Sequence, residues 1–307
     1  MTGPLTGKRL LITGASGFIG RACLARLAGA AYDEIHAVNR SGAGPGGARV
    51  RWHAADLRDP GAAAALIAAL RPSHLLHGAW IATPGLYSSA PENLDWLAGA
   101  LALARAFGEC GGVRLVGIGS SAEYQPGAEL CREDETPIRP ASLYGACKAA
   151  GWQAIQAVAR HHGFSAAWGR LFLPYGPGDA PQRLIPSLVA ALRACQTIET
   201  TEGRQQRDFI LAADAADLFA RLLESDEAGT FNVGTGDGVA VRAVIERLAD
   251  RFQARALLRF GARPMAPGEP MQLVADMSRV RRRLGWSAPT PLAEGLERTL
   301  DDLTARA

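Results

Sequence analysis

Short apolar runs and longer amphipathic stretches alternate through the first 172 residues of this chain, and this alternation limits its possible folds more than any other feature. The apolar runs have the length of buried strands and lie at 9–13, 34–39, 73–79, 114–119 and 166–172. The stretches between them have helical periodicity and lie at 18–28, 60–70, 91–109 and 141–162. Parallel strands joined through helices need right-handed crossovers. The pattern therefore predicts a doubly wound α/β sheet of the Rossmann type, with helices on both faces.

The pattern changes after residue 172, where prolines are frequent. Helices are predicted at 214–224, 239–252, 276–286 and 291–303, and a short strand at 230–233. We therefore predict a Rossmann domain over residues 1–172, with residues 207–235 returning to it. Residues 173–206 and 236–307 are predicted to form a smaller C-terminal domain that binds the substrate.

The segment TGASGFIG at 13–20 joins the first predicted strand to the first predicted helix and places glycines at 14, 17 and 20. In this context Gly14 allows a tight turn, Gly17 lets the backbone approach a pyrophosphate, and Gly20 permits close packing of helix on strand. The helix N-terminus adds free N–H groups and a partial positive charge. Such turns also occur without a ligand, but their position at the first strand–helix junction predicts a dinucleotide site.

The end of the second strand indicates which dinucleotide binds. An acidic residue there would bond to the ribose hydroxyls and repel a 2′-phosphate, but this chain has Asn39 and Arg40. A guanidinium can bind that phosphate, so NADP(H) is preferred, with NAD(H) possible. Arg40 could instead point to solvent, and Arg49 or Arg51 could then reach the phosphate. Asp56, just beyond the third strand, could accept a hydrogen bond from the adenine amino group.

A tyrosine and a lysine lie four residues apart in the run LYGACK at 143–148. If the segment is helical, Tyr144 and Lys148 lie on one face, one turn apart. In isolation, an exposed polar pair at a helix start would explain them. Beside a dinucleotide site, a phenol and an ammonium could instead carry acid–base chemistry.

Charge and cysteine content argue against several classes of function. The 33 basic and 30 acidic residues leave a net charge of +3, too balanced to indicate a surface for nucleic acid or a membrane. We find no apolar run long enough to span a membrane and no signal-peptide pattern, so we expect a cytoplasmic protein. Five dispersed cysteines without a CxxC pair, and six histidines without ligand spacing, argue against a disulfide framework and a metal site.

Taken together, these segments resemble the extended short-chain dehydrogenase/reductases, and among them the NAD(P)-dependent epimerase/dehydratase branch that modifies nucleotide-linked sugars. The similarity covers almost the whole chain. The matching segments are, in order, GASGFIG (14–20), GSSAEY (119–124), YGACK (144–148), GRLFLPYGPG (169–178), RDFI (207–210), FNVGTG (231–236) and ADMSRVRRRLGWSAPTPLAEGL (275–296). A YxxxK pair alone often occurs by chance, but so many segments in the same order are specific.

The resemblance implies roles for individual residues. Tyr144 would be the general acid or base that exchanges a proton with the substrate oxygen, and Lys148 would hold the nicotinamide ribose. Lys148 and the positive nicotinamide of the oxidised cofactor would lower the Tyr144 pKa from its ordinary value of about 10. The third catalytic group would be Ser120, or Ser121 after a shift of one residue, and Ser121 would also contact the substrate. Further cofactor contacts are expected at Ser16, Phe18, Ile19, Leu57, Ala79, Phe172 and Leu173.

The same resemblance bears on the substrate. Arg207 and Arg263 match positions at which the family grips the substrate diphosphate, although structural salt bridges would explain them equally well. Trp80 is expected to line the substrate site. Dehydratases of the family usually place an acidic residue directly after the catalytic Ser or Thr, whereas Glu123 comes later than that. Leu173 stands where relatives often have asparagine, which indicates an unusual sugar specificity.

The leading hypothesis from the sequence is an NADP-dependent 4-keto reductase or epimerase that acts on a nucleotide-linked sugar. The reductase is favoured because a reductant should exchange as NADPH, whereas epimerases and dehydratases usually retain NAD. The alternatives are a nucleotide-sugar dehydratase, a reductase of a non-sugar carbonyl compound, and a dinucleotide-sensing protein without turnover. The resemblance also implies a homodimer formed through the two long helices at 91–109 and 141–162.

Overall fold

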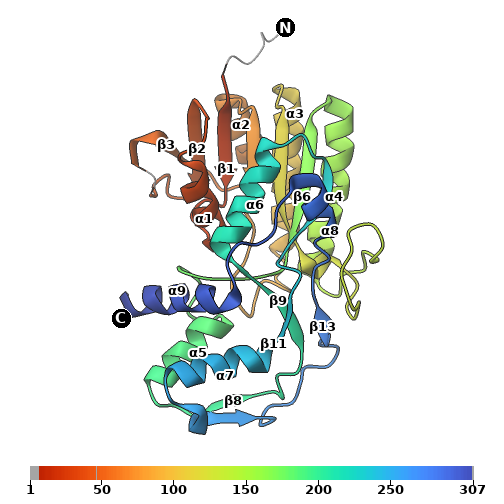
Figure 1. Ribbon diagram of the computed structural model, residues 1–307. Helices are drawn as coiled ribbons and strands as arrows, with labels where there is room; N and C mark the ends of the chain where they lie inside the picture. The colour runs from red at the N-terminus through yellow and green to blue at the C-terminus, as the bar shows by residue number, and fades with distance from the viewer. Residues whose placement is uncertain (1–6, 46, 306–307) are drawn as a thin grey trace.

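The larger sheet of the protein has seven strands, all parallel (Figure 1). The structure is a computed structural model that describes residues 7–45 and 47–305, so residues 1–6, 46 and 306–307 of the predicted ranges lie outside it. The strand order is β10 (Gly229–Val233), β6 (Ser165–Leu171), β5 (Arg114–Ser120), β4 (His74–His77), β1 (Arg9–Thr13), β2 (Glu34–Asn39) and β3 (Val50–Ala54). The chain runs outward from β1 to β3, then from β4 to β6 on the other side. The order therefore reverses between β1 and β4, which is where ligands bind in open α/β sheets.

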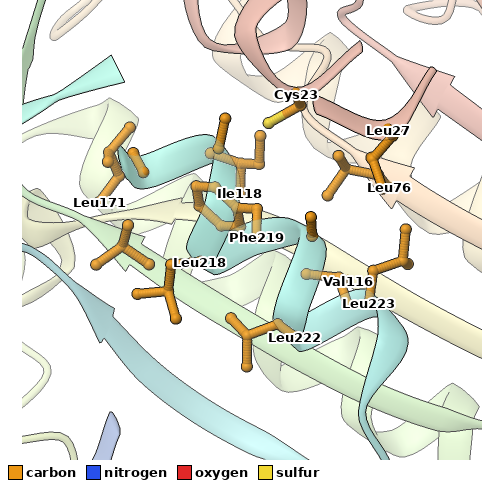
Figure 2. Close-up of a cluster of buried hydrophobic side chains, with 14 of the residues drawn as sticks. Cys23, Leu27, Leu76, Val116, Ile118, Leu171, Leu218, Phe219, Leu222 and Leu223 are labelled. Atoms are coloured by element: carbon orange, nitrogen blue, oxygen red, sulfur yellow. The ribbon is translucent and has the colours of Figure 1, made fainter. Parts of the chain in front are cut away.

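Helices cover both faces of this sheet. One face carries α1 (Phe18–Leu27) and α6 (Ala212–Glu224), and the other carries α2 (Pro60–Leu70), α3 (Asn93–Glu109) and α4 (Leu143–His162). Alternate residues of the strands enter the two cores, so the strands are apolar on both faces, as parallel strands require. Figure 2 shows the first core, in which Leu218, Phe219, Leu222 and Leu223 of α6 meet Val116 and Ile118 of β5 together with Cys23, Leu27, Leu76 and Leu171.

A smaller unit lies beyond the carboxyl ends of the large sheet (Figure 1). Its four-stranded sheet consists of β11 (Gly238–Ala240), β9 (Gln206–Leu211), β13 (Gln272–Leu273) and β7 (Leu173–Tyr175), and a separate pair joins β8 (Ile198–Thr200) to β12 (Leu258–Phe260). Helices α5 (Leu184–Arg193), α7 (Val241–Arg251) and α9 (Leu292–Ala305) share an apolar core with these strands. Three short 3-10 helices complete the fold of the described residues: η1 (Gly47–Arg49), η2 (Ser121–Glu123) and η3 (Arg255–Leu257).

The predicted fold class is confirmed: a doubly wound parallel sheet with a smaller C-terminal part. The segment 207–235 divides between the two parts, because β9 lies in the small sheet, whereas β10 lies in the large sheet and α6 packs against it. Helix α8 (Ser278–Leu284) buries Val280 in the core of the large part, although it follows the small sheet in sequence. The domain boundaries proposed from the sequence stay a prediction.

None of the helices in the described part of the chain is both long enough and apolar enough to cross a membrane.

Candidate active site

A cavity of about 670 Å³ opens at the carboxyl ends of the large sheet, where the strand order reverses. Its walls come from the β1–α1 loop, the ends of β2 and β3, the loop between β4 and α3, and the end of β5. Tyr144 and Lys148 of α4, the segment after β6, and two arginines of the smaller part complete it. The two parts of the protein therefore both contribute to one cavity.

The glycine loop at the floor of this cavity has no room for a Cβ at Gly14 or at Gly20. Gly14 has a φ of +71°, and a Cβ there would lie 2.6 Å from the carbonyl carbon of Gly78. A Cβ on Gly20 would lie 1.9 Å from the Gly14 carbonyl oxygen, so α1 can pack at this distance only with glycine. Gly17 has ordinary extended dihedral angles and an added Cβ would be 3.2 Å from the same oxygen. Its bare backbone faces the cavity, as a pyrophosphate site needs.

The end of β2 presents a cation to the cavity and no acid. The Asn39 side chain is used locally, accepting from the backbone N–H groups of Ser41 and Gly42 and donating to the Ala43 carbonyl oxygen. Arg40 is exposed and lines the cavity. Asn39 therefore orders the glycine-rich loop, and Arg40 is the charged group at this strand end.

Asp56 meets an arginine that the sequence did not predict as part of the site. Arg58 binds both carboxylate oxygens of Asp56 and, with a contribution from Arg40, lowers the Asp56 pKa to about 2. Both residues line the cavity. The two other predicted candidates for a 2′-phosphate are engaged elsewhere, because Arg49 donates to the Tyr32 carbonyl oxygen and Arg51 pairs with Glu34.

Ser120 and Tyr144 lie side by side in the cavity wall, close enough for the Ser120 hydroxyl to act on the pKa of the phenol. The Ser120 Oγ accepts from the backbone N–H of Ala122, which leaves its own proton available for donation. Ser121 also lines the cavity, but Ser120 is the serine that lowers the pKa of the phenol. Burial raises the Tyr144 pKa above its ordinary value and outweighs the effect of the Ser120 hydroxyl, which lowers it. The protein's own groups thus do not lower the Tyr144 pKa as expected.

The reason lies in the direction of the Lys148 side chain. Its Nζ donates to the Ile118 carbonyl oxygen at 2.7 Å and lies 5.9 Å from the centre of the Tyr144 ring. The side chain is buried, and this burial lowers the Lys148 pKa to about 7 despite the nearby charge of Glu123. Two of its three donor positions are left for other partners. The predicted lowering of the Tyr144 pKa by the oxidised cofactor stays a prediction.

Glu123 is turned away from the cavity into the interior of the protein. It is fully buried, and its carboxylate accepts from the backbone N–H of Ser120, from the Trp168 indole and from Arg170 at 3.0 Å. All of these contacts are structural. Glu123 therefore orders the backbone at Ser120 and does not line the cavity wall.

Three arginines of the smaller part occupy different positions. Arg207 lines the cavity, but it is nearly buried, pairs with Glu269 and donates to the Pro270 carbonyl oxygen. Arg263 is exposed and lies outside the cavity lining. Arg183, which the sequence analysis did not single out, lines the cavity and lies 5.6 Å from the ring centre of Tyr87.

The structure brings all but one of the predicted site residues to the same cavity. Those lining it are Gly14, Ser16, Gly17, Phe18, Ile19, Gly20, Asn39, Arg40, Asp56, Leu57, Ala79, Trp80, Ser120, Ser121, Tyr144, Lys148, Phe172, Leu173 and Arg207. The exception is Arg263. Lining residues that the sequence analysis missed include Arg58, Tyr87, Glu92, Trp96 and Arg183. Three of these five follow β4, and their position at the edge where the strand order reverses was the signal that could have identified them.

The glycine cradle, the helix N-terminus behind it and the Tyr144–Lys148 pair fit a nicotinamide dinucleotide laid across this edge. Fold and site together are those of an extended short-chain dehydrogenase/reductase. The sequence model of the NAD dependent epimerase/dehydratase family matches residues 10–234. The chain belongs to that family, as the resemblance in its sequence predicted.

Individual relatives agree with this assignment. The chain is 31% identical over 134 residues to the CDP-abequose synthase of Salmonella muenchen, a match covering 43% of this chain and 45% of the relative. The chain spans about half the length of several curated relatives that it matches. The solved structure of MoeE5 in complex with UDP-glucuronic acid and NAD is 28% identical, with a TM-score of 0.83 and coverage of 97% and 99%. The UDP-glucose 4-epimerase of Thermus thermophilus, in complex with NAD, shares the fold at 23% identity, with a TM-score of 0.86 and coverage of 97% and 100%.

Proposed function

We propose that the protein is an NADP-dependent oxidoreductase that acts on a nucleotide-linked sugar as a 4-keto reductase or an epimerase. The observation that carries the proposal is the juxtaposition of Ser120, Tyr144 and Lys148 in the same cavity as the glycine loop. A nicotinamide cofactor, when bound, supplies hydride transfer. The residues of this chain then have to orient the substrate oxygen and move one proton.

Tyr144 is the proposed proton donor and acceptor for that oxygen, and Ser120 the group that holds it. Their side chains are neighbours in the cavity wall, so a carbonyl or alcohol oxygen bound against them would contact both hydroxyls. Ser120 is preferred to Ser121 for this reason. Lys148 retains donors for the nicotinamide ribose after bonding to Ile118.

The proposed preference for NADP(H) over NAD(H) rests on the end of β2. Asn39 is neutral and holds the loop, and Arg40 is an exposed cation at the cavity wall. Asp56 lies near this end but is bound on both oxygens by Arg58, which reduces its repulsion of a phosphate. An adenine contact for Asp56 stays part of the proposal.

The nucleotide-sugar substrate is inferred from relatives whose names contain CDP-abequose and UDP-glucuronic acid, and from the cavity between the two parts. Of the two arginines proposed to grip a diphosphate, Arg207 faces the cavity while it also pairs with Glu269. Arg263 would reach the substrate only if its loop moved. Trp80 is proposed to form the wall against the sugar.

A reductase or epimerase is preferred to a dehydratase because no carboxylate takes the place expected for an acid in water elimination. Glu123, the nearest acid in the sequence, is held by Arg170 and Trp168 in the interior. A reductase of non-sugar ketones and a dinucleotide sensor place different demands on the site. A non-sugar ketone would need only Ser120 and Tyr144, and a dinucleotide sensor would need neither.

The decisive experiment is a spectrophotometric assay of NADPH consumption with CDP-, UDP- and dTDP-linked 4-keto sugars, with plain ketones in parallel. Turnover of a nucleotide-linked keto sugar is expected. Consumption with plain ketones alone would shift the assignment to the non-sugar reductase. Tight binding of NADPH without turnover of any substrate would support the sensor.

We also propose a cytoplasmic homodimer with no nucleic-acid or membrane partner. Leu94 of α3 is 55% exposed on one of the two helices through which a dimer is proposed, so a Leu94→Arg substitution should dissociate the dimer in light-scattering measurements. The division into a cofactor-binding part, 1–172 with 207–235, and a substrate-binding part, 173–206 with 236–307, belongs to the same proposal.

A further inference from the structure

The ammonium of Lys148 is enclosed by aromatic rings. Its Nζ lies 4.1 Å from the ring centre of Trp80 and 5.7 Å from that of Trp168. Trp168 is fully buried behind it, whereas Trp80 also lines the cavity. Trp80 is therefore the indole that lies both at the ammonium and at the cavity wall.

The Trp80 ring is itself fixed. Its indole N–H donates to the Asn93 Oδ1 at 2.8 Å, and Asn93 is completely buried at the start of α3. The Asn93 amide group in turn donates to the carbonyl oxygens of Tyr87 and Ala90. The orientation of the ring over Lys148 is thus set by a saturated hydrogen-bond network rather than by packing alone.

We propose that Trp80 is a positioning residue for Lys148: its ring covers the ammonium, keeps water away from it and holds it against the Ile118 carbonyl oxygen. The inference rests on the proposed role of Lys148 in the reaction. A cation over an indole face is attracted by the ring quadrupole, and the contact strengthens when water is excluded. Trp80 would then determine where the remaining donors of Lys148 point.

The other titratable groups around Lys148 would not reproduce this effect. Glu123 is buried and bound by Arg170, and Tyr144 lies farther from Nζ than Trp80 does. His77 is buried, and its pKa is lowered to about 3, so it is neutral at physiological pH. The largest influence on the Lys148 pKa is burial itself, to which the Trp80 ring contributes.

The chain allows a direct test because Lys8 and Lys148 are its only lysines. Protein produced with ¹³C-labelled lysine gives two sets of side-chain NMR signals, and Lys8→Arg assigns them. Lys8 is exposed and serves as an internal reference. Two quantities are followed in protein without cofactor or substrate: the upfield ring-current shift of the Lys148 side-chain protons, and the midpoint of its pH titration.

Trp80→Leu is expected to abolish most of the ring-current shift and to raise the titration midpoint by about one pH unit or more, because water then solvates the ammonium. Trp80→Phe removes the indole N–H but keeps an aromatic face, so it should retain most of the shift and move the midpoint by less than about half a unit. Trp96→Leu, another tryptophan of the cavity lining, is the matched control and should leave both quantities unchanged. Thermal unfolding of each variant verifies that it is folded.

Two results would overturn the inference. The first is a Trp80→Leu variant that keeps the wild-type shift and midpoint. The second is an equal change in the Phe and Leu variants, which would assign the effect to the lost Asn93 hydrogen bond and not to the ring. Neither result affects the proposed function, which the turnover assay tests separately.

Discussion

At the scale of single residues, Tyr144 has a phenol whose surroundings oppose ionisation. Burial raises its pKa, Tyr87 and Glu123 raise it further, and only Ser120 and Arg183 act in the opposite direction. A group that keeps its proton is a better acid than base at neutral pH. This environment is consistent with reduction, in which the substrate oxygen has to receive a proton.

Replacement of Tyr144 by phenylalanine tests that role. Tyr144→Phe removes the transferable proton and little volume, so we expect unchanged cofactor affinity and a roughly 10²–10⁴-fold loss of kcat. Titration calorimetry measures the first quantity and the NADPH assay the second. Tyr87→Phe removes only the hydroxyl of the ring that packs edge-on against Tyr144, at 4.9 Å between ring centres, and should lower kcat by less than about tenfold. Near-normal turnover of Tyr144→Phe would remove this residue from the mechanism.

Arg40 carries the second prediction at this scale. If its guanidinium meets the 2′-phosphate, Arg40→Ala should weaken NADPH binding by about one to two orders of magnitude and leave NADH almost unaffected. Calorimetric Kd values for both cofactors provide the measurement. Arg51→Ala is the control, because Arg51 pairs with Glu34 outside the cavity. Tighter binding of NADH than NADPH by the unaltered protein would contradict the cofactor assignment as a whole.

At the scale of elements, the β1–α1 loop combines a folding function with a proposed binding function, and its glycines separate the two. Gly20 is needed for the contact of α1 with the Gly14 carbonyl oxygen, whereas Gly17 leaves space toward the cavity. Gly20→Ala should therefore destabilise the protein by roughly 1–3 kcal/mol or more through overpacking. Gly17→Ala should cost about 1 kcal/mol or less but weaken dinucleotide binding.

Urea denaturation and calorimetry together measure both effects of these substitutions. Gly29→Ala is the control, because Gly29 is exposed and an added Cβ there meets no atom within 4 Å. Its effect on the free energy of unfolding should stay within about 0.5 kcal/mol. A Gly17→Ala variant with wild-type cofactor affinity would show that the pyrophosphate lies elsewhere.

The elements also show how far the sequence could be interpreted. The bounds of β1, β2 and α2 were predicted as they occur, because strands buried on both faces and a helix with an Asp59–Pro60 start have strong local signals. The short strands β7, β8, β11, β12 and β13 were not predicted, because two or three residues have no measurable periodicity. β9 was not predicted either, because its residues mix charged and aromatic side chains. Their pairing partners are distant in sequence.

The site was predictable where backbone geometry dictates the residue, as at the glycine loop, and where two side chains share a helix turn, as at Tyr144 and Lys148. The direction in which a side chain points could not be predicted from the sequence. Glu123 could have faced the cavity by its position in the sequence, and only its pairing with Arg170, 47 residues away, turns it inward. The position of the Arg263 side chain outside the cavity likewise follows from the path of an exposed loop, which could not be predicted from the sequence.

At the scale of the whole molecule, the protonation of Lys148 in the candidate active site affects the free energy of unfolding. Its pKa is about 7 in the folded protein and has the ordinary value of 10.5 in the unfolded chain. Between these values the unfolded chain binds a proton that the folded protein lacks, so stability rises with pH by up to about 1.4 kcal/mol per pH unit from this group. Below about pH 7 Lys148 is protonated in both the folded and the unfolded protein, so the full free-energy cost of burying the ammonium lowers the stability.

Lys148→Met removes this titration and keeps a side chain of similar length. Urea denaturation at pH 7 and pH 9 should show the wild type gaining roughly 2 kcal/mol relative to the variant over this interval. The comparison cancels the contributions of all other titrating groups. Equal pH dependence of the two proteins would mean that Lys148 is not desolvated in the folded state.

The position of β10 has a consequence for synthesis on the ribosome. β10 pairs with β6 at the edge of the large sheet, yet the chain between them builds much of the smaller part. At about 5–20 residues per second, the edge of β6 stays without its neighbour for several seconds after it has emerged. An unpaired apolar edge can associate with other chains. Nascent chains arrested before residue 229 should therefore be more sensitive to protease and more dependent on chaperones than chains arrested after β10 has left the exit tunnel.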